Sequence, residues 1–473
     1  MTSTIRDTTI VRRRWWGLTL IAAAQFAVIM DTSIIGVALP DIQLALGFTP
    51  ESLSWVFNAY VVAFGGLLLL GGRLADVFGA RRMFAIGWAV LLVGSVVAGA
   101  AGDVPIEIAG RAIQGAGAAL IAPAALTLLM TMFGGTSELP RAFAVYGAAA
   151  PIGGSVGVFL GGVLTQWAGW PWVFYATVPL AALVLALTPA LLPPAAGRRA
   201  RVDGWGAVTS TAGLGLLVFA IVRAPEAGWL TAATLVPFVA GVLLLIAFVA
   251  IERRVREPLL RLSLLRRPLL GGANVAQLLL GATWVSMWFF LNLHLQNVLH
   301  ATPFLAGAAL LPMTALIVVG MTTVSPRLAA RFGTRAMVTW GFVLLAVGLV
   351  WLAFARPDGS YVVDVLPATL VAASGMALAF VPSLSTAISA APQQEAGVAS
   401  GLVNTSYQIG SALGLAVLTA LVASVTPGAG AAPYTGGFLG AAIVAALGIL
   451  AGWGLLRAPA SRLSAGPAAR SRD

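Results

Sequence analysis

An acid and a base each lie inside a long apolar stretch of this 473-residue chain, at Asp31 and at Arg111. If these stretches cross a membrane, a carboxylate there costs about 2.5–3.5 kcal/mol on insertion scales, so it is expected to face a cavity and to have a function. A nearby arginine favours the charged carboxylate, whereas burial favours the neutral form. Such a pair can gain and lose a proton as its surroundings change, and we predict proton exchange at Asp31 and Arg111.

The helices that carry these residues should bring them to a similar depth. Asp31 lies nine residues before Pro40, the predicted end of its helix, which is roughly 13 Å at 1.5 Å per residue. Arg111 lies about six residues after the start of its own helix, roughly 9 Å by the same rise, and the two helices run in opposite directions. Two structural alternatives remain open: a carboxylate satisfied by a nearby hydroxyl such as that of Thr32, and a permanent salt bridge. The other acids considered are predicted at helix ends: Asp103, Glu107, Asp203, Asp364 and Glu395.

The composition is that of an all-α polytopic membrane protein. Hydrophobic residues make up 59% of the chain and charged residues only 9%, which leaves too little polar surface for a soluble protein of this length. All 27 basic residues are Arg, which we interpret as the codon bias of a bacterium with a GC-rich genome. The net charge of +11 falls mainly in short predicted loops, where it meets lipid headgroups and not nucleic acid. Cys is absent and there are only two His, so we expect no metal and no cofactor.

Fourteen apolar runs are each long enough to cross a hydrocarbon core of roughly 30 Å. They fall at approximately 16–39, 54–72, 83–101, 105–131, 140–165, 171–192, 204–222, 230–250, 269–295, 304–325, 336–355, 361–386, 396–424 and 436–456. If the N-terminus is cytoplasmic, every Arg except Arg111, Arg223 and Arg356 lies on the cytoplasmic side. The cytoplasmic set includes Arg198, Arg199, Arg201, the cluster from Arg253 to Arg267, and Arg457. This asymmetry predicts fourteen transmembrane helices with both termini in the cytoplasm.

A short basic motif occurs twice, each time between two of the predicted helices. The first copy spans Gly72 to Arg82, and the second spans Arg327 to Arg335, 254 residues later. We predict that the first copy is a cytoplasmic clamp in which Asp76 pairs with an arginine or a helix end and Gly79 allows a tight turn. Its members are Gly72, Asp76, Gly79, Arg81 and Arg82. Ala330 replaces the acid in the second copy, so the predicted clamp is asymmetric.

The duplication predicts two related membrane halves. We expect an N-terminal six-helix bundle at 1–200, an inserted helix pair with a cytoplasmic linker at 201–268, and a C-terminal six-helix bundle with a short cytoplasmic tail at 269–473. The fourteen helices would therefore be arranged as six, two and six. Related halves of this kind are typical of transporters that rock one half against the other.

Further polar and small residues inside the predicted helices are candidates for a substrate path. The predicted cavity residues are Gln25, Asn58, Gln114, Asn292 and His294. The fifth predicted helix carries a stripe of small residues at Gly147, Ala150, Gly154, Gly157 and Gly161, with Pro151 and Gly153 beside it. Small residues let another helix approach closely, and a proline loosens or bends its turn.

These motifs together resemble the major facilitator superfamily, and specifically its fourteen-helix drug:proton antiporter branch of the EmrB/QacA type. The Gly72–Arg82 loop resembles motif A of the superfamily, although Val77 stands where a basic residue is usual. The segment from Met30 to Pro40 resembles the helix 1 motif of the branch, with Gly36 where Asn is typical. The segment Gly110–Gly117 is similar to motif B.

The resemblance extends to the antiporter motif and to the inserted pair. Gly147, Pro151, Gly153 and Gly154 are similar to motif C, although Ala150 replaces the Gly before the proline. The segment Asp203–Gly206 is similar to the start of the inserted pair of the branch. The resemblance implies proton-driven export with Asp31 and Arg111 at the coupling site. Many multidrug members carry further membrane acids, and the absence of deep acids from the last six predicted helices argues against multivalent cationic cargo.

We therefore predict a secondary active transporter: a proton-coupled antiporter that exports lipophilic small molecules such as antibiotics by alternating access. The alternative is an exporter of an endogenous metabolite or lipid, or an uptake facilitator, on the same scaffold. A membrane-embedded enzyme would need clustered carboxylates or a metal motif, and the sequence contains no such cluster. The expected partners are protons, the substrate and membrane lipids, with no nucleic acid, and the protein is expected to be a monomer in the cytoplasmic membrane.

Overall fold

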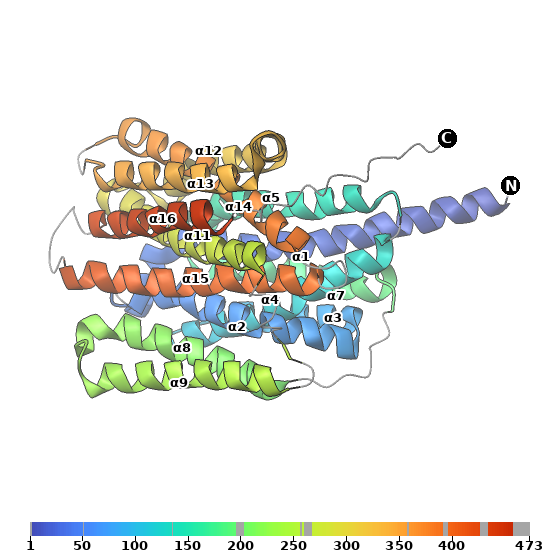
Figure 1. Ribbon diagram of the computed structural model, residues 1–473, viewed down its shortest axis with the longest axis horizontal. Coiled ribbons are helices and arrows are strands. Elements are labelled where there is room, and N and C mark those ends of the chain that lie inside the picture. The colour runs from blue at the N-terminus through green and yellow to red at the C-terminus, as the bar shows by residue number, and fades with distance from the viewer. Residues whose placement is uncertain are drawn as a thin grey trace, which may run out of the picture.

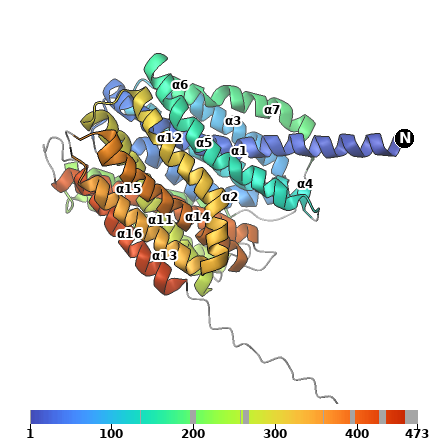
Figure 2. The same ribbon diagram turned by 90° about the horizontal axis from the view of Figure 1, so that it is seen from above.

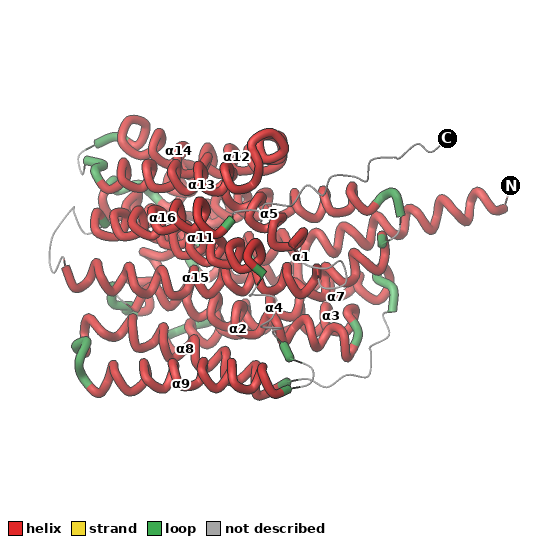
Figure 3. The backbone as a smooth tube through the Cα atoms, in the orientation of Figure 1, coloured by secondary structure: helices red, strands yellow, loops and turns green. Residues whose placement is uncertain are grey.

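The computed structural model is built from helices that lie side by side along one long direction (Figure 1). It describes residues 2–50, 52–134, 136–194, 203–255, 258–259, 267–356, 359–390, 396–425 and 434–456. Several charged positions named above lie outside these ranges, namely Arg198, Arg199, Arg201, Arg256, Arg261, Arg266, Glu395 and Arg457. Within the described ranges only helices, turns and loops occur, and no strand is present (Figure 3).

The elements follow one another in a simple up-and-down order. The earlier helices are α1 (Thr2–Leu46), α2 (Trp55–Phe78), α3 (Ala80–Gly99), α4 (Val104–Phe133), α5 (Leu139–Trp167), α6 (Pro171–Tyr175), α7 (Thr177–Leu191), α8 (Gly204–Ala227) and α9 (Ala232–Arg254). The later helices are α11 (Pro268–Leu293), α12 (Pro303–Val319), α13 (Ser325–Ala353), α14 (Leu366–Ala390), α15 (Ala396–Val425) and α16 (Thr435–Leu455). The short elements η1 (Ser52–Ser54), η2 (His294–Val298), η3 (Gly320–Val324) and η4 (Tyr361–Val365) adjoin them.

The helices have the length and composition of membrane spans. Among the described residues, 12 helices are long and apolar enough to cross a membrane, or up to 13 if the bent pair Ser52–Leu68 and Leu70–Phe78 forms one span. One of the 12 spans, Pro303–Ala353, is 51 residues long and is interrupted by Gly333, whose backbone is not helical. The chain is therefore an all-α polytopic membrane protein, as the composition predicts.

One predicted helix end is misplaced. The helix that carries Asp31 does not end near Pro40 but continues to Leu46, so Pro40 lies inside α1. A proline removes one backbone hydrogen bond, and helices packed in a membrane bundle tolerate this loss because neighbouring groups compensate. Leu39 and Ile42, on either side of Pro40, are completely buried, and their packing holds the continued helix in place.

Two groups of helices pack mainly among themselves. In the first half, which we define as α1–α7, α1 packs on α5 while α4 packs on both α2 and α3. In the second half, α11–α16, α13 packs on α14 and α16, and α11 packs on α15 and α16. The pairs α5–α12 and α2–α15 join the halves. Helices α8 and α9 pack on each other along one edge, where α8 also contacts α2 and α15 (Figure 1).

The halves approach each other at one end of the bundle. We call the end that holds the α1–α2 loop the Phe48 end, and the end that holds the α2–α3 turn the Gly79 end. Figure 2 shows the two halves together where α1 ends and α12 begins, and diverging toward the beginning of α1 and the end of α16. The halves therefore meet mainly toward the Phe48 end.

Hydrogen bonds between the halves lie at the same end. The Gln296 side-chain amide donates to the Val37 carbonyl at 2.8 Å, and the backbone N–H of Phe304 donates to the Gln166 side chain at 3.2 Å. Gly36 faces α11 so closely that an added Cβ would lie 2.8 Å from side-chain nitrogens of the second half. Helix α1 thus links the interior of the first half to the contact between the halves.

Candidate functional site

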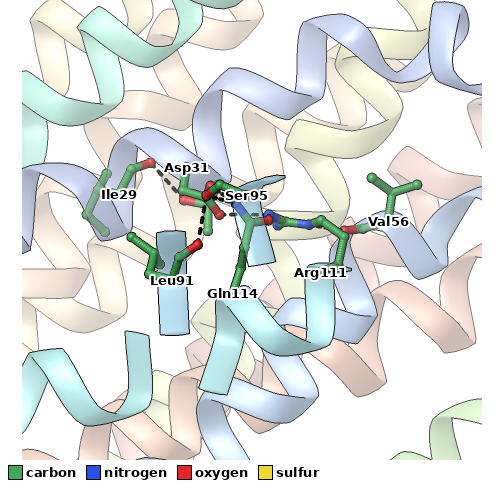
Figure 4. Close-up of polar contacts among 8 residues, drawn as sticks. Ile29, Asp31, Val56, Leu91, Ser95, Arg111 and Gln114 are labelled. Atoms are coloured by element: carbon green, nitrogen blue, oxygen red, sulfur yellow. Dashed lines mark hydrogen bonds and ion pairs between the residues drawn. The ribbon is translucent and has the colours of Figure 1, made fainter. Parts of the chain in front are cut away.

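Asp31 on α1 and Arg111 on α4 are in direct contact, and both side chains are completely buried (Figure 4). Arg111 Nη1 donates to Asp31 Oδ2 at 2.7 Å. Gln114 Nε2 donates to Asp31 Oδ1 at 2.9 Å and to the Ser95 hydroxyl of α3 at 2.8 Å. The Ser95 hydroxyl donates to the Leu91 carbonyl at 2.9 Å. Each carboxylate oxygen therefore accepts a hydrogen bond, and one of the two donors is a cation, which makes that hydrogen bond a charge-assisted one.

The guanidinium of Arg111 is held on several sides. Its Nε donates to the Val56 carbonyl of α2 at 2.8 Å, and Nη1 also donates to Gln114 at 2.6 Å. The guanidinium carbon lies 4.6 Å from the centre of the Tyr60 ring and 5.9 Å from that of Phe174, close enough for cation–π attraction. Nη2 is buried and has no hydrogen-bond partner. Arg111 thus connects α1, α2 and α4 and keeps one donor unused.

Helix α5 fixes the position of the Asp31 turn. Methyl groups added at Gly153, Gly157 and Gly161 would lie 2.4, 2.8 and 2.5 Å from carbonyl oxygens of α1. The carbonyl that faces Gly157 belongs to Met30, the residue before Asp31. Small side chains on α5 therefore allow backbone contact beside the buried carboxylate.

The predicted small-residue stripe is correct only in part. Gly157 and Gly161 lie in this close contact, but Gly154 makes only ordinary contact, with its nearest neighbouring atom 3.7 Å from an added Cβ. Gly147 has no neighbouring atom within 4 Å of an added Cβ. Gly153, predicted to lie beside the stripe, continues the contact, because it lies one turn before Gly157 and two turns before Gly161 and so shares the helix face that contacts α1. Pro151 lies within α5, and its side chain is outside the described part of the structure.

The structure places the two predicted partners, Asp31 and Arg111, together. The Thr32 hydroxyl donates to the Ile29 carbonyl at 2.8 Å and not to Asp31, so the alternative of a carboxylate satisfied by that hydroxyl is wrong. Ser95 is a member of the network that the sequence analysis missed. A serine in an apolar helix carries little signal, and only the packing of α3 on α4 reveals its role.

The five predicted cavity residues occupy different environments. Gln114 belongs to the Asp31 network, while half-buried Gln25 accepts a hydrogen bond from the Tyr146 hydroxyl of α5 at 3.0 Å. Asn58, Asn292 and His294 are buried, and each has one side-chain polar atom without a hydrogen-bond partner. The structure therefore brings only Gln114 into contact with Asp31, and it leaves three buried polar groups with unused hydrogen-bonding capacity.

The prediction for Glu107 is incomplete. This residue lies in the first turn of α4, as expected of an acid near a helix end, but its side chain is completely buried. Neither carboxyl oxygen has a hydrogen-bond partner in the described part of the chain. The position of Glu107 near a helix end does not indicate that its side chain is buried. The available sequence signal is its spacing of four residues before Arg111, which places both side chains on one helix face. Asp103, at the start of the same helix, is exposed and caps it by accepting from the Ile106 N–H at 2.9 Å.

The α2–α3 turn is as tight as predicted. Gly79 alone separates the two helices, with φ 92° and ψ 132°, a conformation that favours glycine. Gly333 has φ 79° and ψ 157° in the second copy of the motif. Asp76 is exposed and has no hydrogen bond or ion pair to any described residue. Arg81 donates to the Leu192 carbonyl at 3.2 Å, so the predicted clamp pairing of Asp76 is absent from this conformation.

Comparison with known proteins identifies the family. The Major Facilitator Superfamily pattern matches residues 21–415. The chain is 39% identical over 418 residues to a puromycin resistance protein of Streptomyces alboniger, covering 88% of this chain and 83% of the relative. It is 41% identical over 434 residues to a cephamycin export protein of Amycolatopsis lactamdurans, covering 90% and 89%. The chain therefore belongs to the Major Facilitator Superfamily and is a membrane transporter, not an enzyme.

Solved structures share the fold. An auto-inhibited peptide transporter of the POT family has a TM-score of 0.67 at 18% identity, covering 93% of this chain and 95% of the other. A nucleoside transporter has a TM-score of 0.62 at 14% identity, covering 93% and 99%. At these identities the likeness establishes the arrangement of helices alone.

Proposed function

We propose that this member of the Major Facilitator Superfamily exports lipophilic, antibiotic-like molecules in exchange for protons. The observation that carries the proposal is the fully buried Asp31–Arg111 pair, since a carboxylate inside a membrane bundle is costly unless it has a task. The names of the similar puromycin resistance and cephamycin export proteins support antibiotics as cargo and export as the direction. Proton exchange at Asp31 would supply the driving force.

Asp31 is the group that gains and loses the proton. Its two oxygens are held by Arg111 and Gln114, so protonation weakens the attachment of α1 to α4. The same helix meets the second half at Gly36 and Val37, one to two turns further on. When the helical turn that carries Asp31 is released from α4, α1 can transmit this change to the contact between the halves. Protons and cargo act by favouring different conformations of the two halves.

We propose that the described conformation is the one that opens toward the Gly79 end. Hydrogen bonds between the halves lie at the Phe48 end, and the halves diverge toward the Gly79 end (Figure 2). Asp76 is exposed and has no partner among the described residues, which fits this state, since the clamp would form only when the Gly79 end closes. With the Gly79 end in the cytoplasm, as the arginine distribution predicts, this is the state that receives cargo from inside.

Fourteen spans, arranged as six, two and six, are the topology we propose. The 51-residue span Pro303–Ala353 supports two helices because it is broken at Gly333, and α8 and α9 support an inserted pair because they pack on each other at the edge. Both termini are cytoplasmic in this proposal. The first bundle spans 1–200, the inserted pair with its linker spans 201–268, and the second bundle spans 269–473.

Reporter fusions test this topology. Fusions after Gly197 and after Arg261 should report the cytoplasm, and a fusion near Glu226 should report the outside. A cytoplasmic result at Glu226 would remove the inserted pair.

The cargo we propose is neutral or weakly charged. Among the described residues of the second half the only acid is Asp364, at the Phe48 end, where it is bound to Arg356 at 3.0 Å. No described carboxylate of that half is left to receive a cation. The transporter works as a monomer within membrane lipids, because its two halves already form the complete pathway.

Drug susceptibility in an efflux-deficient bacterium tests the function. Cells that produce the intact chain should tolerate more puromycin than control cells, and Asp31→Asn should remove this protection at equal protein level. Asp41→Asn is the matched control, since it changes the same residue type on the same helix away from Arg111. Equal protection by Asp31→Asn and the intact chain would contradict the proposal.

A further inference from the structure

Glu107 is a buried carboxyl group without a hydrogen-bond partner among the described residues. It lies four residues before Arg111 and seven before Gln114, so the three side chains share one face of α4. An isolated buried carboxylate costs several kcal/mol, and buried acids without partners hold their proton instead. We therefore describe Glu107 as neutral in this conformation, while Asp31 is the charged partner of Arg111.

Arg111 has an unused hydrogen-bond donor, which matches the unused acceptors of Glu107. Nε and Nη1 bind Val56, Gln114 and Asp31, whereas Nη2 is buried and unpaired. A glutamate and an arginine four residues apart on a helix are within reach of each other. The charged groups that act electrostatically on Glu107 are Arg111, on its own helix, and Asp31, on α1.

A tyrosine is a further titratable group in contact with Arg111. Tyr60 of α2 lies under the guanidinium of Arg111, and its buried hydroxyl has no hydrogen-bond partner. A phenol stays protonated near neutral pH, so it does not alter the charge of the group. The local charge is therefore set by Asp31, Arg111 and Glu107.

We propose that Glu107 is the second counter-ion of Arg111 and that Glu107 and Asp31 share one proton between them. In the described state Asp31 is charged and bound to Arg111, and Glu107 holds the proton. In the alternative state the proton of Glu107 has moved to an Asp31 oxygen, and Arg111 pairs with the Glu107 carboxylate. The guanidinium stays charged throughout, and the three groups keep a net charge of zero in both states.

This exchange lowers the cost of protonating Asp31. Without Glu107, a neutral Asp31 would leave the Arg111 cation buried and unpaired, which is strongly unfavourable. With Glu107, Arg111 moves from one carboxylate to the other. Glu107 lies close to the start of α4 at the Phe48 end, so in the proposed topology it is the member of the group nearest to the outside. The inference deepens the proposed function and rests on proton exchange at Asp31.

Infrared spectroscopy of the purified protein tests the location of the proton independently of transport. At neutral pH the intact protein should show the carbonyl stretch of a protonated carboxylic acid. Glu107→Gln should remove the contribution of Glu107 to that band. Asp31→Asn imitates the neutral carboxyl and leaves Arg111 to pair with Glu107, so it should remove this contribution as well, whereas Asp103→Asn should retain it. A carboxylic-acid band of equal strength in Glu107→Gln and in the intact protein would show that the proton is not on Glu107 and would overturn the inference.

Transport in proteoliposomes supplies the second test, with puromycin as the probe. Glu107→Gln should lower proton-driven accumulation by about tenfold or more, the scale of a typical coupling free energy, while exchange of puromycin for puromycin continues. Glu107→Asp, which keeps the carboxyl, should retain part of the accumulation. Asp103→Asn is the matched control, because it removes an exposed acid from the same helix end and asparagine still caps the helix. Normal proton-driven accumulation by Glu107→Gln would contradict the inference, whereas loss in Asp31→Asn alone would leave the proposed function intact.

Discussion

The helix pairs α3–α4 and α13–α14 are two versions of one packing arrangement with different chemistry. A Cβ added to Gly94 of α3 would meet the backbone N of Gln114 at 2.5 Å. A Cβ added to Gly348 of α13 would meet the backbone N of Ala372 at 2.8 Å. Gln114 and Ala372 therefore occupy equivalent positions. The glycines that bring the helices together are present in both halves, but the polar side chain is present in one.

The equivalence extends along both pairs. One turn before Gln114 lies Arg111, and the same step before Ala372 leads to Thr369. Ser95 follows Gly94 directly, and Leu349 follows Gly348. The second half thus has threonine, alanine and leucine where the first has arginine, glutamine and serine. The same helix packing is present in both halves, whereas the polar side chains of the proposed proton-exchange site are present in the first.

The largest expected difference between the pairs comes from truncating Arg111 and its equivalent. Arg111→Ala leaves the Asp31 carboxylate buried without its cation and should lower the free energy of unfolding by about 3–5 kcal/mol. Thr369→Ala removes only a hydroxyl that donates to a carbonyl of its own helix, and should cost about 1 kcal/mol or less. Thermal unfolding of both variants in detergent measures this contrast. Equal losses would mean that the pair is not the distinguishing feature of the first half.

The next contrast removes the polar group that joins α3, α4 and α1. Gln114→Ala leaves Asp31 Oδ1 and the Ser95 hydroxyl without their shared donor, and should cost about 1–3 kcal/mol. It should also weaken proton-driven transport, because Asp31 is then held by Arg111 alone. Ser95→Ala should have a smaller effect on transport, since Gln114 keeps its bond to Asp31. A larger transport loss from Ser95→Ala than from Gln114→Ala would reverse this order.

The two glycine turns should respond alike. Gly79 and Gly333 both have positive φ, so alanine at either position should cost about 1–3 kcal/mol through backbone strain. Similar shifts in unfolding temperature would confirm that this part of the repeat is shared. A difference of several kcal/mol between Gly79→Ala and Gly333→Ala would show that the two turns contribute unequally to the stability of the fold.

The smallest expected change in stability is at Asp76. The side chain is exposed and has no described partner, so Asp76→Ala should change the free energy of unfolding by about 0.5 kcal/mol or less. Turnover should nevertheless slow, because the proposed clamp forms when the Gly79 end closes. Initial rates of puromycin export, together with the unfolding temperature, separate these two effects. Unchanged turnover would remove Asp76 from the clamp.

The general fold could be predicted because it rests on strong signals. Long apolar runs predict membrane helices, and the repeated motif predicts the two positive-φ turns at Gly79 and Gly333. Helix rise measured from Pro40 places Asp31 at a similar depth to Arg111, and the contact is present although α1 continues six residues beyond Pro40, to Leu46. The end of α1 was less predictable, because packing around Leu39 and Ile42 overrides the local effect of a proline.

The details of the site depend on contacts between helices. Ser95 joins Gln114 only because α3 packs on α4. Glu107 lies near a helix end in sequence, and its burial is set by neighbouring helices that linear spacing does not reveal. Asp76 has no partner among the described residues in this conformation, so its sequence motif indicates the proposed clamp without fixing the contact that Asp76 makes.

The most direct test of the central claim is proton-driven transport by Asp31→Asn. Purified protein in liposomes is given a pH gradient, and the accumulation of puromycin is followed with Asp41→Asn as the control on the same helix. Asparagine keeps the approximate shape of the neutral carboxyl and cannot titrate, so accumulation should fail while exchange of puromycin for puromycin continues. Asp41→Asn should accumulate puromycin like the intact chain. Accumulation by Asp31→Asn in response to the pH gradient would move the coupling to another group and leave Asp31 with a structural role.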